Sequence, residues 1–405
     1  MLKPTTATIS KQLSAHMEKL SVQIGPRPSG SPENHVAAEY IHDVFRGCNL
    51  EVERQTFPCP SWKDLGTMLE LGGNQLAAAA NAFSPPCDIT APAVSVGTLA
   101  ELEIVELKDR IAVLYGDLVI APIACKSWFL KSDKEERLVQ LLEEKQPSAI
   151  ITIQANSGEL ERLIEDWEFH IPSATVPAKS GLTIMENLGL PLHLKIDTQF
   201  SSGSTSNVVA RKNGQNSSRI VFMAHYDTKI DTPGALDNAS GVAVLLTLAQ
   251  SLSHHELPPG LEWIAFTNEE YLPLGDDEYL RRHESSLGNV EVAINFDGVG
   301  QRLSVNSIAI YANSQAFRER VDLIKQKYPG IVWVDPWPES NHSSFSWRGV
   351  PCLAFTSRSR SRIAHLRTDT VDLVDPEKLV ELVSFVSEIV VSIQNDPQGW
   401  TRPGE

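Results

Sequence analysis

The sequence contains few cysteines and no long apolar segment, and both absences exclude classes of protein. Its five cysteines are odd in number and include no C-x-x-C pair, so neither a disulfide framework nor a cysteine-ligated zinc site is expected. No window approaches the roughly 18 consecutive apolar residues that a membrane-spanning helix needs. Residues 1–20 carry Lys3, Lys11, His16 and Lys19 and lack the apolar core of a signal peptide. We therefore expect a cytoplasmic protein, unless a leader has already been removed.

Positive charge is also scarce. The chain has 35 Lys and Arg against 51 Asp and Glu, which gives a formal net charge of −16. An acidic surface repels nucleic-acid phosphates and anionic lipid headgroups, so neither is an expected partner. The hydrophobic fraction of 42% and the charged fraction of 21% are ordinary for a globular protein. A length of 405 residues allows two or three domains, or one large domain with an insertion. The sequence does not indicate an oligomeric state.

The character of the chain changes along its length. Residues 62–200 mix short β-like runs with acidic helical stretches, and the cluster Ser201-Ser202-Gly203-Ser204 has the composition of a linker. We therefore expect a main domain of residues 1–61 and 201–395, interrupted by an inserted domain of residues 62–200. Residues 396–405 would form a C-terminal tail.

After residue 205, apolar strands alternate with helices. The expected strands are 207–211, 220–224, 261–267, 292–296, 308–311 and 351–355, and the expected helices are 241–252, 316–327 and 377–394. This alternation predicts an α/β fold with a central mixed, mostly parallel sheet flanked by helices. The inserted domain is expected to be a smaller, β-rich α/β domain.

Polar side chains follow the ends of the predicted strands. They are His225 and Asp227 after strand 220–224, Asp237 before the next helix, Glu269 and Glu270 after strand 261–267, Asp297 after strand 292–296, and His365 beyond strand 351–355. Ligand sites in open α/β sheets collect at the carboxyl ends of strands, so these side chains should converge. Packed carboxylates repel one another unless cations neutralise them. Two imidazoles with three carboxylates suit zinc, cobalt or manganese better than calcium or magnesium.

Each of these residues also has an ordinary structural interpretation. Asp237 alone could cap a helix, and Asp297 before Gly298 could belong to a turn. Glu269 and Glu270 alone could be solvated surface. The hypothesis of a metal site depends on their joint occurrence after buried strands.

The motifs as a set resemble those of the co-catalytic zinc aminopeptidase family, which includes aminopeptidase Y and the bacterial leucyl aminopeptidases. The resemblance rests on His225-x-Asp227, Gly234-Ala-Leu-Asp237-Asn238-Ala-Ser-Gly241, Glu269-Glu270, Asn295-Phe-Asp297, His365 and the opening Ile24-Gly-Pro-Arg27. It covers residues 7–57 and 205–390, and it implies the zinc exopeptidase fold, which is phosphorylase/hydrolase-like. The inserted segment resembles a protease-associated domain in residues 107–114, 147–153 and 171–177.

The resemblance implies a metal-dependent exopeptidase, most simply an aminopeptidase that acts on peptides or dipeptides. It implies two divalent ions, with zinc preferred over cobalt or manganese. Asp237 would bridge both ions. His225 and Glu270 would complete one ion site, and Asp297 and His365 would complete the other.

Further roles follow from the same resemblance. Glu269 would be the general base of the reaction and not a ligand. Asp227 would hold the far nitrogen of the first histidine and fix its tautomer. Asp369 would either support the second histidine in the same way or form a turn. A cis peptide bond between Asp237 and Asn238 is also implied.

The sequence departs from the family pattern at two positions. Asn341 stands in Ser340-Asn341-His342 where relatives usually have an aspartate, and Asp276 stands where they usually have a serine. The neighbouring His342 is a candidate residue near the site.

The loop from Ser357 to Arg367 is rich in arginine. Arg358 and Arg360 stand close in sequence to His365. They are expected either to pair with nearby acids or to bind a substrate carboxylate, because guanidinium groups bind carboxylates bidentately.

Two other functions remain open at this point. A glutaminyl cyclase, which is an acyltransferase with one zinc on the same fold, is suggested by His225-Tyr-Asp-Thr-Lys229. A non-catalytic, receptor-like binding module is a second alternative, but that branch of the fold has lost its metal ligands. A metal count would separate these possibilities.

Overall fold

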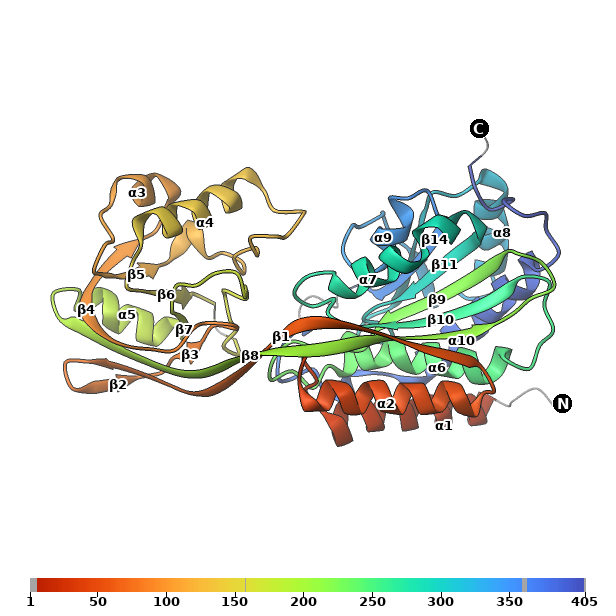
Figure 1. Cartoon of the computed structure of the whole chain (residues 1–405), viewed down its shortest axis with the longest axis horizontal. Coiled ribbons are helices and arrows are strands. Elements are labelled where there is room, and N and C mark those ends of the chain that lie inside the picture. Colours follow the sequence, from red (N-terminus) through yellow and green to blue (C-terminus); the bar gives the residue numbers. More distant parts are fainter. Residues whose placement is uncertain (1–5, 157, 359–362, 404–405) are drawn as a thin grey trace. The chain divides into compact units, whose positions relative to one another are not determined.

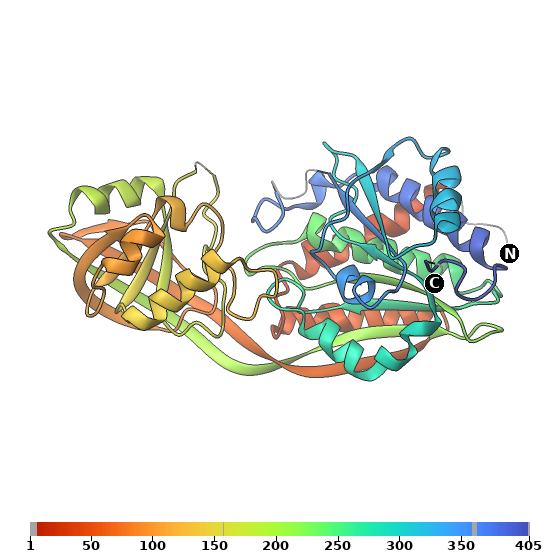
Figure 2. The same ribbon diagram turned by 90° about the horizontal axis from the view of Figure 1, so that it is seen from above.

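The computed structural model describes residues 6–156, 158–358 and 363–403. Contacts between residues divide the chain into two compact units, Met1–Cys59 with Ser204–Glu405 and Pro60–Gly203. We refer to them as the main unit and the inserted unit. Two long strands, β1 (Glu51–Leu71) and β8 (Pro191–Lys212), pair with each other and carry the chain from one unit to the other (Figures 1 and 2).

Residues 201–204, expected as the linker out of the inserted domain, lie at the boundary between the two units, because the inserted unit ends at Gly203 and the main unit resumes at Ser204. They lie inside β8, in extended backbone. Small polar residues favour loops when the backbone has no partner, but β1 pairs with β8 and satisfies its backbone groups.

In the main unit the sheet has the strand order β13-β12-β14-β11-β9-β10-β8, and β1 pairs with β8. Besides β8, its strands are β9 (Arg219–His225), β10 (Gly260–Phe266), β11 (Val290–Phe296), β12 (Asn306–Tyr311), β13 (Ile331–Trp333) and β14 (Cys352–Ser357). Strands β14, β11, β9 and β10 are parallel to one another, whereas β8 and β12 are antiparallel to their neighbours. The predicted mixed, mostly parallel α/β sheet is therefore confirmed.

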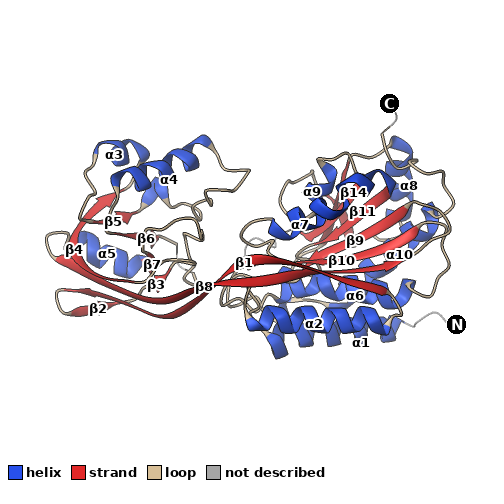
Figure 3. Cartoon of the chain, viewed as in Figure 1, coloured by secondary structure: helices blue, strands red, loops and turns tan. Residues whose placement is uncertain are grey.

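Helices cover both faces of this sheet (Figure 3). They are α1 (Thr6–Met17), α2 (Pro32–Gly47), α6 (Ser240–Leu252), α7 (Leu274–His283), α8 (Gln315–Lys325), α9 (His342–Ser346) and α10 (Pro376–Ile393). Successive residues of a strand point to opposite faces. In β9, Phe222 packs into a core with α1, α2, α6 and α10, while Met223 packs into a second core with α7 and α9. Burial on both faces explains why β9 is an almost continuous apolar run.

Helix α6 is buried along most of its length and lies inside the main core. Its residues Val242–Leu246 are fully buried. A Cβ atom at Gly241 would lie only 2.3 Å from the carbonyl oxygen of Phe296, so glycine permits the close approach of this helix to the end of β11. The start of α6 is thereby held beside Asp297.

The inserted unit is a smaller sheet with helices. Its parallel strands are β4 (Cys87–Val96), β5 (Ile111–Leu114), β6 (Ala149–Gln154) and β7 (Ser173–Pro177), its short strands are β2 (Asn74–Leu76) and β3 (Ala79–Ala80), and its helices are α3 (Leu99–Ile104), α4 (Asp133–Lys145) and α5 (Ala178–Glu186). Helix α4 begins at a capping box, in which Ser132 and Glu135 satisfy each other's backbone N–H groups.

The last described residues pack onto the main unit. The Thr401 carbonyl accepts a hydrogen bond from the N–H of Ser314 at 2.7 Å, and the rings of Trp400 and Phe317 are in contact. Among the described residues, none of the helices is both long enough and apolar enough to cross a lipid bilayer.

Candidate metal centre

The residues predicted from the strand ends stand at one edge of the main sheet. They are His225 as the last residue of β9, Glu269 and Glu270 in the loop after β10, Asp297 directly after β11, Asp237 in the Ala235–Ala239 turn before α6, and His365 in the loop after β14. The four strands are parallel, so their carboxyl ends meet at this edge. The side chains therefore converge at this edge of the sheet.

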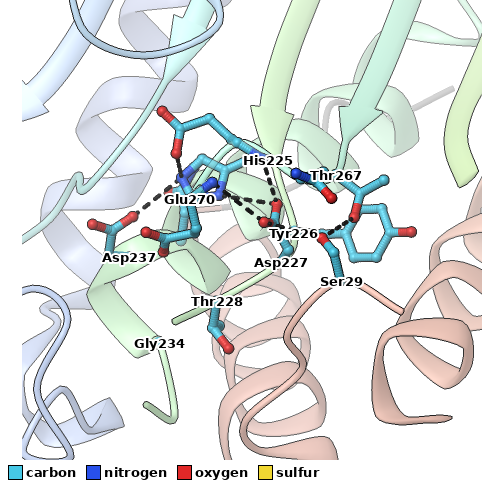
Figure 4. A network of polar contacts seen from close by, with 12 residues as sticks. Ser29, His225, Tyr226, Asp227, Thr228, Gly234, Asp237, Thr267 and Glu270 are labelled. Atoms are coloured by element: carbon cyan, nitrogen blue, oxygen red, sulfur yellow. Dashed lines mark hydrogen bonds and ion pairs between the residues drawn. The ribbon is translucent and has the colours of Figure 1, made fainter. Parts of the chain in front are cut away.

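The side chains of His225, Asp237 and Glu270 lie close together (Figure 4), and one ligand atom of each lies within 4.8 Å of the others. Nε2 of His225 is 3.1 Å from Oδ1 of Asp237 and 3.6 Å from Oδ1 of Asp297. Nε2 of His365 is 3.3 Å from Oδ2 of Asp237 and 3.1 Å from Oε2 of Glu270. The two oxygens of Asp237 therefore face two different histidines.

These distances suit ligands that share an ion. Tetrahedral zinc with ligand bonds of about 2.0–2.1 Å holds its ligand atoms about 3.3 Å apart. In the described part of the chain, Nε2 of His225 and Oε1 of Glu270 are also buried without a hydrogen bond of normal geometry. Buried polar atoms nearly always have a partner, so a bound cation would account for these two. The donor set therefore fits a divalent metal.

The electrostatics of the cluster agree with this. Burial raises the pKa of Glu269 to about 8, and the carboxylates of Asp297 and Glu270 act in the same direction. Burial alone would lower the pKa of His365, but Glu270 and Asp237 outweigh it and raise the pKa to about 10. For His225, too, burial would lower the pKa of the ring, but its acidic neighbours outweigh this effect and raise the pKa. The site thus attracts positive charge, which protons or metal cations can supply.

Comparison with known proteins places this geometry in a family. Residues 207–390, which include all the residues of the cluster, match Peptidase family M28. The chain carries a peptidase family M28 domain. The resemblance predicted from the motifs is therefore confirmed.

Individual relatives of the M28 domain are distant. Aminopeptidase YwaD of Bacillus subtilis (strain 168) is 26% identical over 300 residues, a match that covers 72% of this chain and 62% of that protein. The chain thus spans less than two thirds of the length of this relative. The crystal structure of a zinc aminopeptidase from Bacillus subtilis has a TM-score of 0.78 at 21% identity, and the match covers 98% of both chains. A glutaminyl cyclase from Fimbriiglobus ruber has a TM-score of 0.53 at 12% identity and covers 94% of both chains. At these identities the structures establish the fold alone.

Asp227 is a fully buried residue of the M28 domain behind His225. Its Oδ1 is 3.6 Å from Nδ1 of His225. Its carboxylate also accepts weak hydrogen bonds from the backbone N–H groups of Glu269 and Glu270 at 3.3 and 3.4 Å, and from the hydroxyl of Ser29 at 3.3 Å. One carboxylate therefore contacts both the first histidine and the loop with the two glutamates.

Asp369 holds the Ala235–Ala239 turn, which carries Asp237, through its carboxylate. Its carboxylate accepts hydrogen bonds from the N–H groups of Leu236 at 2.7 Å and Asp237 at 3.0 Å. Its own backbone N–H donates to the carbonyl oxygen of Leu366 at 3.0 Å, and of the two roles expected for Asp369 this contact favours the turn. Burial, together with the nearby Asp237, raises the pKa of Asp369 to about 7. The expected cis peptide bond between Asp237 and Asn238 is present in this same turn.

Arg27 connects the loops of the site, and the sequence analysis did not predict this role. Its guanidinium is fully buried and donates to the carbonyl oxygens of Tyr226 at 2.6 Å, Pro233 at 2.8 Å and Gly234 at 3.0 Å. It also donates to the carbonyls of Leu20 and Gly25. Burial lowers the pKa of Arg27 to about 10, so the group remains charged at neutral pH. The only sequence signal was its place in the motif Ile24-Gly-Pro-Arg27.

The remaining candidates contact residues outside the cluster of proposed ligands. Nε2 of His342 is 2.9 Å from the carbonyl oxygen of Trp337, and its ring packs against the rings of Tyr311 and Trp337. Arg358 is exposed at the end of β14, where its backbone N–H donates to the carbonyl of Val305. Arg360 lies outside the described residues, so the two hypotheses for the arginine-rich loop stay predictions.

Proposed function

We propose that this chain is a zinc-dependent aminopeptidase that holds two divalent ions in one site and removes N-terminal residues from peptides. The observation that carries the proposal is the orientation of Asp237, whose Oδ1 faces His225 and whose Oδ2 faces His365. A carboxylate shared between two sets of ligands is suited to bridge a pair of ions. The family match and the aminopeptidase relatives support the choice of reaction.

The distances favour a different ligand pairing from the one that the resemblance implied. Oε2 of Glu270 is 3.1 Å from His365, and Oδ1 of Asp297 is 3.6 Å from His225. We therefore assign His365 and Glu270 to one ion and His225 and Asp297 to the other, with Asp237 between them. One ligand atom each from His225, Asp237 and Glu270 also lies within 4.8 Å of the others. We base the proposed pairing on the shorter contact of Glu270 with His365.

Glu269 is the group that we assign as the general base. Its side chain is 19% exposed, whereas those of Asp237 and Asp297 are almost fully buried, so it is the more accessible to water. When bound, divalent ions supply Lewis-acid chemistry, which polarises a carbonyl group and makes water more acidic. A carboxylate with a pKa near neutrality can accept the proton of the attacking water and then pass it to the leaving amine. The surrounding negative charge also attracts the ammonium group of a free peptide N-terminus, which would favour exopeptidase action.

Metal removal is the first test of this function. Exhaustive dialysis against a chelator is expected to abolish hydrolysis of aminoacyl p-nitroanilides, and added zinc should restore it. Elemental analysis of the active protein should find two ions per chain, and the melting temperature should fall on removal, because a ligand bound to the folded state stabilises it. N-acetylated substrates are the control and should not be cleaved. Full activity after complete metal removal would refute the proposal.

The same metal count addresses both alternatives. A glutaminyl cyclase-like enzyme would hold one zinc ion, and the two-sided contacts of Asp237 argue against that arrangement. A non-catalytic binding module would bind no ion, yet all five candidate ligands and Glu269 are in place.

We propose further that the inserted unit is a protease-associated-like domain. The three segments that carry this resemblance overlap the parallel strands β5, β6 and β7. Their apolar residues are buried in the core of this unit.

A further inference from the structure

The turn Ser340–His342, which we name the bridging turn, contacts Asp276 and Asn295, two residues that lie next to different parts of the metal centre. On one side, Nδ2 of Asn341 donates a hydrogen bond of 2.6 Å to Oδ2 of Asp276. On the other side, the hydroxyl of Ser340 accepts a hydrogen bond of 2.9 Å from Nδ2 of Asn295. Asp276, Asn341 and Asn295 are all at most 2% exposed. The bridging turn thus joins two buried polar groups, of which Asp276 lies in helix α7 and Asn295 in strand β11.

The first contact leads to the loop that holds the two glutamates. Asp276 lies in the first turn of α7, directly after that loop. The carbonyl of the preceding Gly275 accepts a hydrogen bond of 2.7 Å from Asn207. A Cβ atom at Gly275 would lie 2.2 Å from the carbonyl oxygen of Thr267, so α7 is packed tightly against the end of β10. Both ends of the Glu269–Glu270 loop are therefore anchored near Asp276.

The second contact leads to a metal ligand. Asn295 lies in β11, two residues before Asp297. In the sheet order, β9 separates β11 from β10, so no backbone ladder joins the strand before Asp297 to the strand before Glu269. The bridging turn provides a connection between them that does not pass through β9.

Two features at this contact are energetically unfavourable by themselves, one in the bridging turn and one at Asp276. Ser340 has a φ angle of 81°, in the left-handed region that residues other than glycine rarely adopt. Asp276 is a buried carboxyl, and burial raises its pKa to about 7. Strained backbone and buried charge persist where the surrounding structure holds them, and both are concentrated at functional sites.

We propose that Asp276 and Asn341 are positioning residues for the metal centre, whose hydrogen bond makes the bridging turn a strut between Asp297 and the Glu269–Glu270 loop. This inference rests on the proposed function, and it concerns residues that touch neither metal nor substrate. Asp276 and Asn341 are also the two positions at which the sequence departs from the family pattern, and they contact each other. The carboxylate comes from α7 and the amide from the turn.

Exchange of the two side chains is the test. Asn341→Asp alone would place a second carboxylate beside Asp276, and we expect kcat to fall at least 10-fold with KM changed less than about 3-fold. Zinc affinity, measured by competition with a chromogenic chelator, should fall by about 10-fold, as for other residues outside a ligand set. The double variant Asp276→Asn/Asn341→Asp restores one carboxylate and one amide, so kcat and zinc affinity should recover to within about 3-fold of wild type.

The control is Glu262→Gln, which alters a buried carboxylate at the opposite end of β10, where it pairs with Arg211 and Arg219. It should lower stability without changing kcat or zinc affinity. If Asn341→Asp does not fold, Asn341→Ala removes the donor without adding charge and should give the same losses. Unchanged kcat and zinc affinity in the single variants, or no recovery in the double variant, would overturn the inference. A wild-type protein without peptidase activity would instead refute the proposed function, and the zinc affinities would still test the strut.

Discussion

Glu269→Gln is expected to lower kcat about 1,000-fold while the protein keeps its full metal content. Glutamine has nearly the same shape as glutamate but cannot accept a proton at neutral pH, and general base catalysis contributes about 100- to 10,000-fold. The loop should keep its conformation, because Asp227 holds it through the backbone N–H groups of Glu269 and Glu270. Steady-state kinetics and elemental analysis measure the two quantities separately.

Glu270→Gln is the matched comparison, because it makes the same replacement of a carboxylate by an amide at the adjacent residue. We expect this variant to bind metal more weakly, since Glu270 contacts His365 at 3.1 Å. High zinc concentrations should then recover part of its activity, whereas they should not rescue Glu269→Gln. A Glu269→Gln variant with more than a tenth of wild-type kcat would exclude this residue as the base.

Arg27→Met is expected to lower the free energy of unfolding of the main unit by roughly 3–5 kcal/mol and to weaken zinc binding. The substitution leaves buried carbonyl oxygens of Tyr226, Pro233 and Gly234 without their donor, and each unsatisfied buried group costs about 1–3 kcal/mol. These carbonyls belong to the loops that carry Asp227 and Asp237. Denaturant unfolding of the metal-free protein and chelator competition measure the two effects.

Two control variants separate the causes. Arg27→Lys keeps the positive charge but loses the planar fork, so it should recover only a small part of the stability. Arg219→Met removes a partly buried arginine, which contacts Glu262 and Ser286 at the far end of the sheet. That variant should lose stability and keep its zinc affinity. Equal zinc affinities for Arg27→Met and Arg219→Met would contradict a role for Arg27 in the site.

The sequence predicted those features of the fold and site that depend on local pattern. Apolar runs predicted β9, β10 and β11 to within about two residues, because strands buried on both faces contain few polar residues. The polar residues after those runs predicted the cluster, since parallel strands end at one edge of a sheet. His225, Glu270 and Asp297 were found in this way.

Features that depend on remote partners could not be predicted from local pattern. Arg27 contacts Gly234 across 207 positions, and Asn341 contacts Asp276 across 65 positions. No periodicity connects such residues. The ligand pairing that we propose depends likewise on a remote contact, that of Glu270 with His365. The Ser201–Ser204 segment has the composition of a loop, and its pairing with β1 decided otherwise.

The pairing of β1 with β8 has a consequence for the origin of the inserted unit. The hydroxyls of Thr56 and Ser206 are 2.8 Å apart, so the outgoing and returning segments lie side by side where the chain leaves the main unit. In topological terms, residues 60–203 occupy the tip of a hairpin. Lengthening or shortening a hairpin tip leaves the register of its stem unchanged, so such a module can be gained or lost in one genetic event. A main unit closed by a tight turn at this point would keep the same two strands as its stem.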